Sequence, residues 1–246
     1  QGKDRVLMPG LVNGHTHAAM VLFRGLADDL DLMTWLTKVI FPMEGRFVDA
    51  DFVATGARLA CWEFIRGGTT TVVDMYFHPE VSAQEFESCG LRAILGAPMI
   101  DYPSPGFEGW DDSFAAGRRF ASEWADNNGR IRPALAPHAP YSVAPEHLRQ
   151  VAAAARELGV PVMIHLAEDQ AELDAVRKRY RTTPIRHLQA LGLLEVPLIA
   201  AHVVLPARKE IPLLATAGTG VIHNPTSNLK TGAGIAPVPD LLAAGV

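Results

Sequence analysis

Two histidines separated by one residue, His15 and His17, stand at the end of an apolar run over residues 6–14. In an extended strand, residues i and i+2 point to the same face, so both imidazoles can converge on one point. Two neutral imidazoles aimed at one point are a natural start to a transition-metal site, most often a zinc site. Surface strands and expression tags contain the same pair, so the interpretation needs support from the other histidines.

Further histidines recur in the same setting along the chain. Four short apolar runs each stop at a histidine, namely His138, His165, His202 and His223. Such runs are typical of strands that are buried on both faces. A histidine kept for packing would fall anywhere along a strand, whereas histidines at the carboxyl ends of several strands indicate a shared site, as in (β/α)8 barrels.

The elements that must position these histidines alternate between strand and helix patterns. Seven strand patterns lie near residues 6–14, 69–75, 91–99, 131–137, 160–164, 197–201 and 220–222. This alternation predicts an α/β fold with a parallel sheet and right-handed crossovers. An open doubly wound sheet would carry a glycine-rich phosphate loop, and the sequence contains no G-x-G-x-x-G or Walker motif. We therefore expect a (β/α)8 TIM barrel.

An eighth strand would begin where the sequence ends, at Val246. We expect residues 1–246 to form one barrel domain of about seven strands that stops before strand eight. A chain that ends there leaves an unclosed sheet edge, which is a liability. The sequence is therefore interpreted as a piece of a longer chain, or as a chain whose terminus is not the natural one.

The composition is that of an ordinary globular enzyme. The 246 residues are 48% hydrophobic and 20% charged, with a net charge of -5 and no basic cluster, which argues against a nucleic-acid partner. No run approaches the ~18 apolar residues of a membrane span, and no signal-peptide pattern is present, so we expect a cytoplasmic protein. Cys61 and Cys89 lie far apart in helical patterns, and we expect reduced thiols.

Several segments carry a family resemblance. Residues 9–17 resemble the first-strand motif of the metal-dependent amidohydrolase superfamily, residues 165–168 its fifth-strand motif and residues 201–202 its sixth. Within that superfamily, residues 15–20, 24–30, 136–141 and 223–230 are similar to the 5-methylthioadenosine/S-adenosylhomocysteine deaminases. Guanine, triazine and pterin hydrolases share parts of these motifs.

The resemblance implies a zinc-dependent hydrolytic deaminase. Zinc held by His15, His17 and His165 would keep an open position for water and lower its pKa to roughly 7, and iron or manganese could replace it. The hydroxide would attack the aminated ring carbon and release ammonia. Glu168 would move the proton, and His202 would hydrogen-bond the water and the developing oxyanion. The structural alternatives are a helix N-terminal carboxylate for Glu168 and a satisfied buried histidine for His202.

Three further residues are implied in binding the substrate. Glu44 would accept hydrogen bonds from the vicinal ribose hydroxyls, although it could equally be a solvated loop charge. His138 would contact the purine or the sugar. Trp35 would wall the pocket, unless it packs in the core. A small-molecule substrate is the expected partner, without nucleic acid or membrane, and a homo-oligomer is left open.

The sequence also departs from the family pattern. The family's fourth protein ligand, an aspartate at the end of strand eight, falls beyond Val246, and its small β-sandwich is missing from both ends. If 1–246 is the whole chain, we expect poor solubility, weak metal retention and little deaminase activity. No arginine occurs between Arg92 and Arg118 to meet the carboxylate of S-adenosylhomocysteine, which favours a neutral nucleoside.

Three functions stay open on the sequence. The first is deamination of an adenosine-type nucleoside, namely 5-methylthioadenosine, adenosine or S-adenosylhomocysteine. The second is hydrolysis of another aminated or chlorinated heterocycle, such as guanine, a pterin or a triazine. The third is a non-catalytic barrel that acts as a scaffold. The joint presence of four histidines and Glu168 favours an enzyme, because a scaffold has no need for all five.

Overall fold

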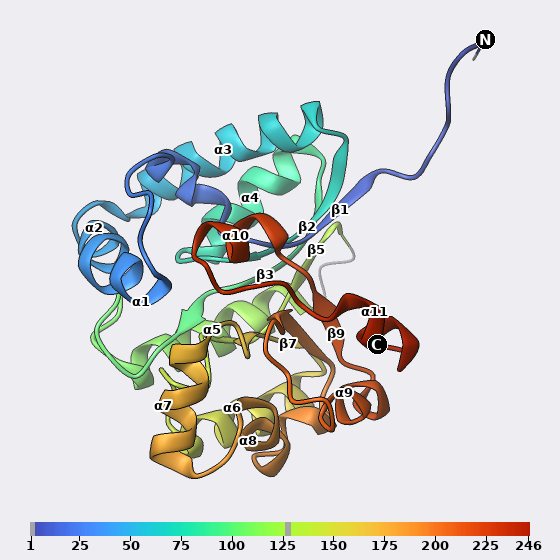
Figure 1. Cartoon of the computed structure of the whole chain (residues 1–246). Helices are drawn as coiled ribbons and strands as arrows, with labels where there is room; N and C mark the ends of the chain where they lie inside the picture. Colours follow the sequence, from blue (N-terminus) through green and yellow to red (C-terminus); the bar gives the residue numbers. More distant parts are fainter. Residues whose placement is uncertain (1–2, 126–128) are drawn as a thin grey trace.

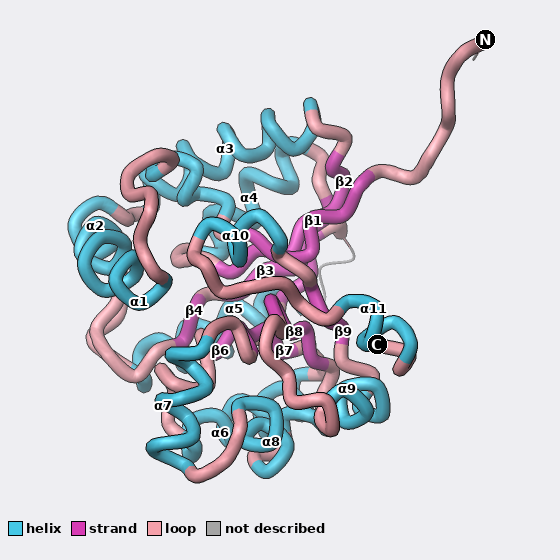
Figure 2. The backbone as a smooth tube through the Cα atoms, in the orientation of Figure 1, coloured by secondary structure: helices cyan, strands magenta, loops and turns pink. Residues whose placement is uncertain are grey.

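The computed structural model describes residues 3–125 and 129–246 and has a parallel α/β architecture. The strands are β1 (Leu11–Thr16), β2 (Thr69–Met75), β3 (Arg92–Gly96), β4 (Pro98–Met99), β5 (Ile131–Pro133), β6 (Ala136–Pro137), β7 (Val162–Leu166), β8 (Leu198–His202) and β9 (Gly220–Ile222). They pair in parallel in the orders β1-β2-β3-β5, β4-β6 and β7-β8-β9. The strands occupy the middle of the molecule, and helices cover them (Figure 2).

These nine segments correspond to the seven predicted strands. β3 and β4 divide the predicted strand at 91–99, and β5 and β6 divide the one at 131–137. Prolines interrupt both ladders, since Pro98 and Pro133 have no N–H to donate. Backbone hydrogen bonds between neighbouring segments continue past these interruptions. Leu135 N donates to the Pro161 oxygen at 3.0 Å, and His138 N donates to the Met99 oxygen at 3.0 Å.

The barrel is not closed in this structure. Among the described strands, β1 pairs only with β2 and β9 pairs only with β8. The two end strands nevertheless approach each other, since a Cβ atom built on Gly14 would lie 2.8 Å from the Ile222 side chain. The expectation of an incomplete (β/α)8 barrel is confirmed, because the strands form parallel ladders that follow the chain order without closing.

Helical segments connect the strands and cover the outside of the sheet. The β1–β2 connection contains η1 (Ala18–Phe23), α1 (Leu32–Thr34), the π-helix η2 (Trp35–Ile40), α2 (Phe41–Phe47) and α3 (Ala50–Arg66). Later connections contain α4 (Pro79–Cys89), α5 (Trp110–Ala125), α6 (Pro145–Leu158), α7 (Gln170–Tyr180), α8 (Pro184–Ala190), η3 (Leu193–Glu195), α9 (Ile211–Ala217), α10 (Pro225–Lys230) and α11 (Val238–Ala243). In Figure 1, α3 and α4 lie on one side of the strands, and α6, α8 and α9 lie on the other.

The two largest of the apolar clusters among the described residues flank the strands. The larger one packs α6, α8 and α9 on β7 and β8, and it contains Leu148, Ile164 and Leu188. The smaller one packs α3 and α4 on β2 and β3, with Phe86 and Leu95 at its centre. Each large side chain fully buried in this way contributes about 1.5–3 kcal/mol, so these cores hold the strand ends in place.

One close contact anchors the segment that follows the His15–His17 pair. Gly56 in α3 lies directly under η1, and a Cβ atom there would come within 2.6 Å of the Ala19 backbone oxygen. Only glycine permits this approach, because the obstructing atoms belong to the main chain. The turn after His17 is therefore fixed by α3 as well as by β1.

Two further expectations concern the cysteines and the membrane. Cys61, buried in α3, and Cys89, at the end of α4, are both free thiols, in line with the expected reduced state. No described helix combines the length and the apolar character that a bilayer crossing requires.

Candidate metal and hydrolase site

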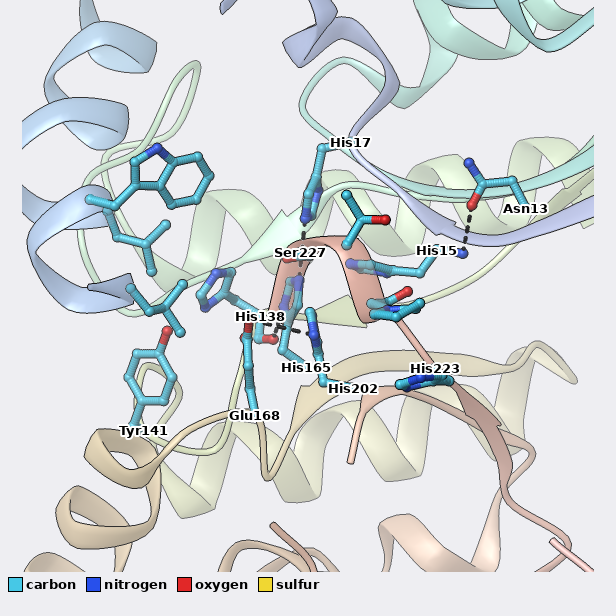
Figure 3. A pocket seen from close by; sticks show the side chains of 16 residues that line it. Asn13, His15, His17, His138, Tyr141, His165, Glu168, His202, His223 and Ser227 are labelled. Atoms are coloured by element: carbon cyan, nitrogen blue, oxygen red, sulfur yellow. Dashed lines mark hydrogen bonds and ion pairs between the residues drawn. The ribbon is translucent and has the colours of Figure 1, made fainter. Parts of the chain in front are cut away.

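Histidines from separate strands meet in one cavity of about 430 Å³ at the carboxyl ends of the strands. His15 lies in β1 and His17 directly after it, His165 lies in β7, and His202 is the last residue of β8. Figure 3 shows these four imidazoles gathered together, with Glu168 beside them. The cavity is also lined by Asn13, Leu32, Trp35, Leu36, His138, Tyr141, His223, Asn224, Pro225, Thr226 and Ser227.

The spacing of the imidazole nitrogens suits a shared divalent ion. The Nε2 atoms of His17 and His165 lie 3.3 Å apart. Two nitrogens bound tetrahedrally to one ion at roughly 2.0–2.1 Å lie about 3.3 Å from each other, so the distance fits. Among the described residues, the set whose ligand nitrogens all lie within 4.8 Å of one another is His15, His165 and His202, so His17 is tied to this cluster through His165.

The outer nitrogens of two imidazoles determine which nitrogen faces the cavity. Nδ1 of His17 lies 2.5 Å from the Met75 oxygen, and Nδ1 of His165 lies 2.7 Å from the His138 oxygen. A carbonyl oxygen can only accept, so Nδ1 carries the hydrogen and the Nε2 lone pair is free. A hydrogen bond of this kind orients metal-binding histidines and fixes their tautomer.

The site keeps its imidazoles uncharged. Burial, and next the neighbouring histidines, lower the pKa of His15 and His165 well below the usual value, and burial also lowers the pKa of His17. The same causes lower the pKa of His138 to about 3 and that of His202 to about 4. All five are therefore neutral at pH 7, which is the form that binds metal.

Glu168 is held in the cavity wall by a second buried carboxylate. The backbone N–H groups of Ala167 and Glu168 donate to the two Glu172 oxygens at 3.0 and 2.8 Å. Ala167 takes a left-handed φ of 49°, which turns the chain away from β7. The N-cap of α7 is Asp169, whose side chain accepts from Glu172 N, so Glu168 is not needed to cap the helix.

The environment of Glu168 favours its protonated form. Burial, followed by the Glu172 and Asp169 carboxylates, raises the pKa of Glu168 to about 8. One Glu168 oxygen lies 3.5 Å from Nδ1 of His202. A carboxyl group that titrates near neutral pH in a cavity can both accept and return a proton.

The expected substrate residues occupy two connected regions. Trp35 and His138 line the main cavity, and both also line a small cavity of about 60 Å³ that contains Glu44. Glu44 is 5% exposed, so it is not a solvated loop charge, and burial raises its pKa to about 7. His138 is fixed by Ser142, whose Oγ lies 2.9 Å from its Nδ1.

Several residues at the site were not predicted from the sequence. Asp74, at the end of β2, is buried and accepts a hydrogen bond of 2.7 Å from Ala18 N, directly after His17. Its position at a strand end, like that of the histidines, was the available signal. Asn228 contacts His202, and Tyr141 lines the cavity; both lie in the resembling segments 223–230 and 136–141, which was the available signal.

Comparisons with known proteins agree with this geometry. A family model described as "Amidohydrolase family" matches residues 6–246. The 5-methylthioadenosine/S-adenosylhomocysteine deaminase of Carboxydothermus hydrogenoformans is 47% identical over 247 residues, which cover 100% of this chain and 56% of the relative. That of Syntrophobacter fumaroxidans is 44% identical over 241 residues, covering 98% and 55%. The chain thus spans little more than half the length of these relatives.

A solved structure is similar over nearly the whole chain. An adenosine deaminase from Xanthomonas campestris with bound zinc superposes with a TM-score of 0.93 and 41% sequence identity. The match covers 97% of this chain and 54% of that chain.

Proposed function

This chain belongs to the amidohydrolase family, and on that premise we propose that residues 1–246 form the metal-dependent hydrolase domain of a deaminase. Its substrates are adenosine-type nucleosides, namely 5-methylthioadenosine, adenosine and S-adenosylhomocysteine. The observation that carries the proposal is the meeting of His15, His17, His165, His202 and Glu168 in one cavity. The names of the relatives, and the zinc in the Xanthomonas enzyme, support it.

His15, His17 and His165 would hold one divalent ion, zinc in the first instance and iron or manganese as substitutes. When bound, such an ion acts as a Lewis acid that lowers the pKa of a water molecule to roughly 7. The 3.3 Å separation of the His17 and His165 nitrogens and the two carbonyl-bound Nδ1 atoms support this assignment. His202 is kept outside the set, because its Nδ1 faces the side-chain amide of Asn228.

The protein groups then manage protons. Glu168 takes a proton from the attacking water, whose oxygen forms a bond to the amino-bearing carbon of the purine. Glu168 gives that proton to the adjacent ring nitrogen, and a further proton transfer lets the carbon–nitrogen bond break and ammonia leave. His202 donates a hydrogen bond to the oxygen on which negative charge develops. Water and the amino-purine become ammonia and the corresponding oxo-purine, so all atoms balance.

The adjoining cavities support a neutral nucleoside. Trp35 and His138 would flank the base, and the Glu44 carboxylate would accept from the ribose hydroxyls. Beyond Glu44 lies a cavity of about 350 Å³, walled by Phe41, Phe77 and Tyr102. No lysine or arginine is among the described residues that line it, so an uncharged thioether fits better than the carboxylate of S-adenosylhomocysteine.

The test is ammonia release by the full-length, zinc-loaded protein on a panel of aminated purines, pterins and triazines. We expect 5-methylthioadenosine and adenosine to be converted, and S-adenosylhomocysteine to be a poorer substrate. Turnover of triazines or pterins without nucleosides would overturn the substrate class. Bound zinc without turnover of any compound would indicate a scaffold. A cytoplasmic location and a homo-oligomer belong to the same proposal and are checked by fractionation and light scattering.

A further inference from the structure

Three of the four clustered histidines have a partner at Nδ1, and the partners differ in kind. For His17 and His165, Nδ1 faces a backbone carbonyl, which can only accept. For His202, Nδ1 faces the side-chain amide of Asn228, whose Nδ2 lies 2.9 Å away. Asn228 is fully buried and His202 is 3% exposed, so no bulk water competes for this bond.

This difference has a chemical consequence. The Asn228 amide N–H donates, so Nδ1 of His202 must be the acceptor. A neutral imidazole has one N–H, which then lies on Nε2. An Nε2–H group cannot bind a metal, but it can donate a hydrogen bond to an oxygen in the cavity. His202 is therefore the opposite tautomer of His17 and His165.

Burial of the Asn228 side chain supports the orientation in which Nδ2, and not Oδ1, faces His202. In the structure, Oδ1 of Asn228 has no partner, whereas Nδ2 is hydrogen-bonded. If Oδ1 and Nδ2 of Asn228 exchanged places, both amide N–H bonds would be buried at the position where Oδ1 now lies, without an acceptor. Unpartnered buried N–H groups are rarer than unpartnered carbonyls, which have two lone pairs to satisfy.

Both partners are held firmly. Asn228 N donates to the Asn224 oxygen at 3.0 Å, and the Asn228 oxygen accepts from Ala233 N at 2.9 Å, so α10 is fixed on both sides of the amide. His202 takes a left-handed φ of 78°, and the next residue, Val203, donates to the Leu166 oxygen at 2.9 Å. The backbones that carry both side chains are thus held in place.

Glu168 is the competing partner. Its oxygen lies 3.5 Å from the same Nδ1 atom, and a carboxylate there would accept an Nδ1–H and select the other tautomer. Asn228 is 0.6 Å nearer and offers a donor, so it determines the outcome. Without Asn228, the Nε2 lone pair of His202 would face the cavity and add a fourth imidazole to the metal set.

We propose that Asn228 is a positioning residue that keeps His202 in the Nε2–H tautomer, which excludes this histidine from the metal ligands and makes it a hydrogen-bond donor. The role of that donor in turnover rests on the proposed function, but the tautomer itself does not. The assignment also removes His202 from the His15–His165–His202 set that distance alone gives, and leaves His17, whose Nε2 lies 3.3 Å from that of His165, to complete the proposed ligands.

The test uses ¹⁵N NMR of histidine-labelled full-length protein, metal-free and zinc-loaded, with His202 assigned through His202→Gln. We expect the Nε2–H tautomer in the parent. In Asn228→Asp a carboxylate accepts from Nδ1, so the tautomer should reverse and kcat should fall about 10²-fold, as for loss of an oxyanion donor, with KM little changed. Leu229→Ala, at an exposed position of the same helix outside the cavity lining, should leave tautomer and kcat unchanged.

The possible results separate the tautomer of His202 from the proposed function. An Nδ1–H tautomer in the parent overturns the inference whether or not the variants fold. An unchanged tautomer in a folded Asn228→Asp protein overturns it as well, and Asn228→Ala, which removes the amide donor, provides the same test if the aspartate variant unfolds. If the tautomer reverses in Asn228→Asp but the parent protein has no deaminase activity, the proposed function is wrong and the inference about the tautomer is supported.

Discussion

The proposed proton transfer by Glu168 can be tested with one substitution. It lies in the cavity beside His202, and its pKa is raised to about 8 mainly by burial. Glu168→Gln keeps the size and polarity of the side chain but cannot carry a proton. We expect zinc content to stay near normal, as measured by atomic absorption, while turnover falls about 10²-fold or more.

Asp169→Asn is the matched control for that substitution. It changes the next carboxylate along the chain, and asparagine caps helices as well as aspartate does. Turnover in this variant should stay within a small factor of the parent. Full activity in Glu168→Gln would assign proton transfer to another group.

Glu44 should make stability depend on pH. Burial raises its pKa from 4.5 to about 7, so the folded state holds a proton that the unfolded state has already released between these values. The stabilisation is complete below about pH 4.5 and is lost as pH rises through 7. The loss amounts to at most about 3 kcal/mol, and Glu44→Gln should remove it.

Urea unfolding at pH 4.5 and pH 8 measures this effect. The parent should lose stability relative to Glu44→Gln at the higher pH, whereas Glu108→Gln, at an exposed position, should follow the parent. Equal pH profiles for parent and Glu44→Gln would contradict the argument. If Glu44 also binds the ribose, KM for nucleosides should rise in Glu44→Gln.

Individual residues at the site differ in how far the sequence could predict them. The histidines that end apolar runs were predictable, because strand ends of a parallel barrel meet at one face. Their roles as ligands and donor stay predictions. The local hydrogen bonds of Glu172 were not predicted. Asn228 lies in the resembling segment 223–230, but its contact with His202 could not be predicted, because which side chain of a helix faces a distant histidine depends on packing between segments.

At the scale of elements, the contact between α3 and η1 should be intolerant of a methyl group. Gly56→Ala places Cβ 2.6 Å from the Ala19 oxygen, and the main chain there cannot turn aside. We expect a loss of about 1–3 kcal/mol in unfolding free energy, since overpacking outweighs the gain in helix propensity.

Gly45→Ala in α2 is the matched comparison. A Cβ atom there meets nothing within 4 Å, so alanine should add about 0.5–1 kcal/mol through helix propensity alone. Urea unfolding of both variants provides the test. Equal effects at the two positions would mean that the η1 contact is not tight.

The strands were predicted better than their interruptions. Runs buried on both faces identify seven strands, but β3/β4 and β5/β6 are split where prolines remove ladder donors. The segment at 32–40 folds largely as the π-helix η2. Its i→i+5 pairing has no sequence pattern of its own, so only the structure reveals it.

At the scale of the whole molecule, the proposed ion would join separate sheets. His17 follows β1 of the four-stranded sheet, and His165 lies in β7 of the three-stranded sheet. Zinc at about 100 times its Kd should raise the unfolding free energy by about 2.7 kcal/mol, and a chelator should reverse the change. Calorimetry with and without chelator measures it, and His17→Ala should abolish the difference. An unchanged melting temperature in the parent would argue against a site between the two sheets.

The separation of His17 and His165 along the chain, 148 residues, also bears on the kinetics of folding. Closing so long a loop costs entropy that is recovered only once both sheets have formed and docked, so the ion site is complete late on the folding route. Zinc at about 100 times its Kd should then slow unfolding about 100-fold and leave the refolding rate unchanged, as interactions absent from the transition state do. A faster refolding limb in stopped-flow measurements would contradict this order of events. Bound zinc would thus set the lifetime of the native state without hastening its formation.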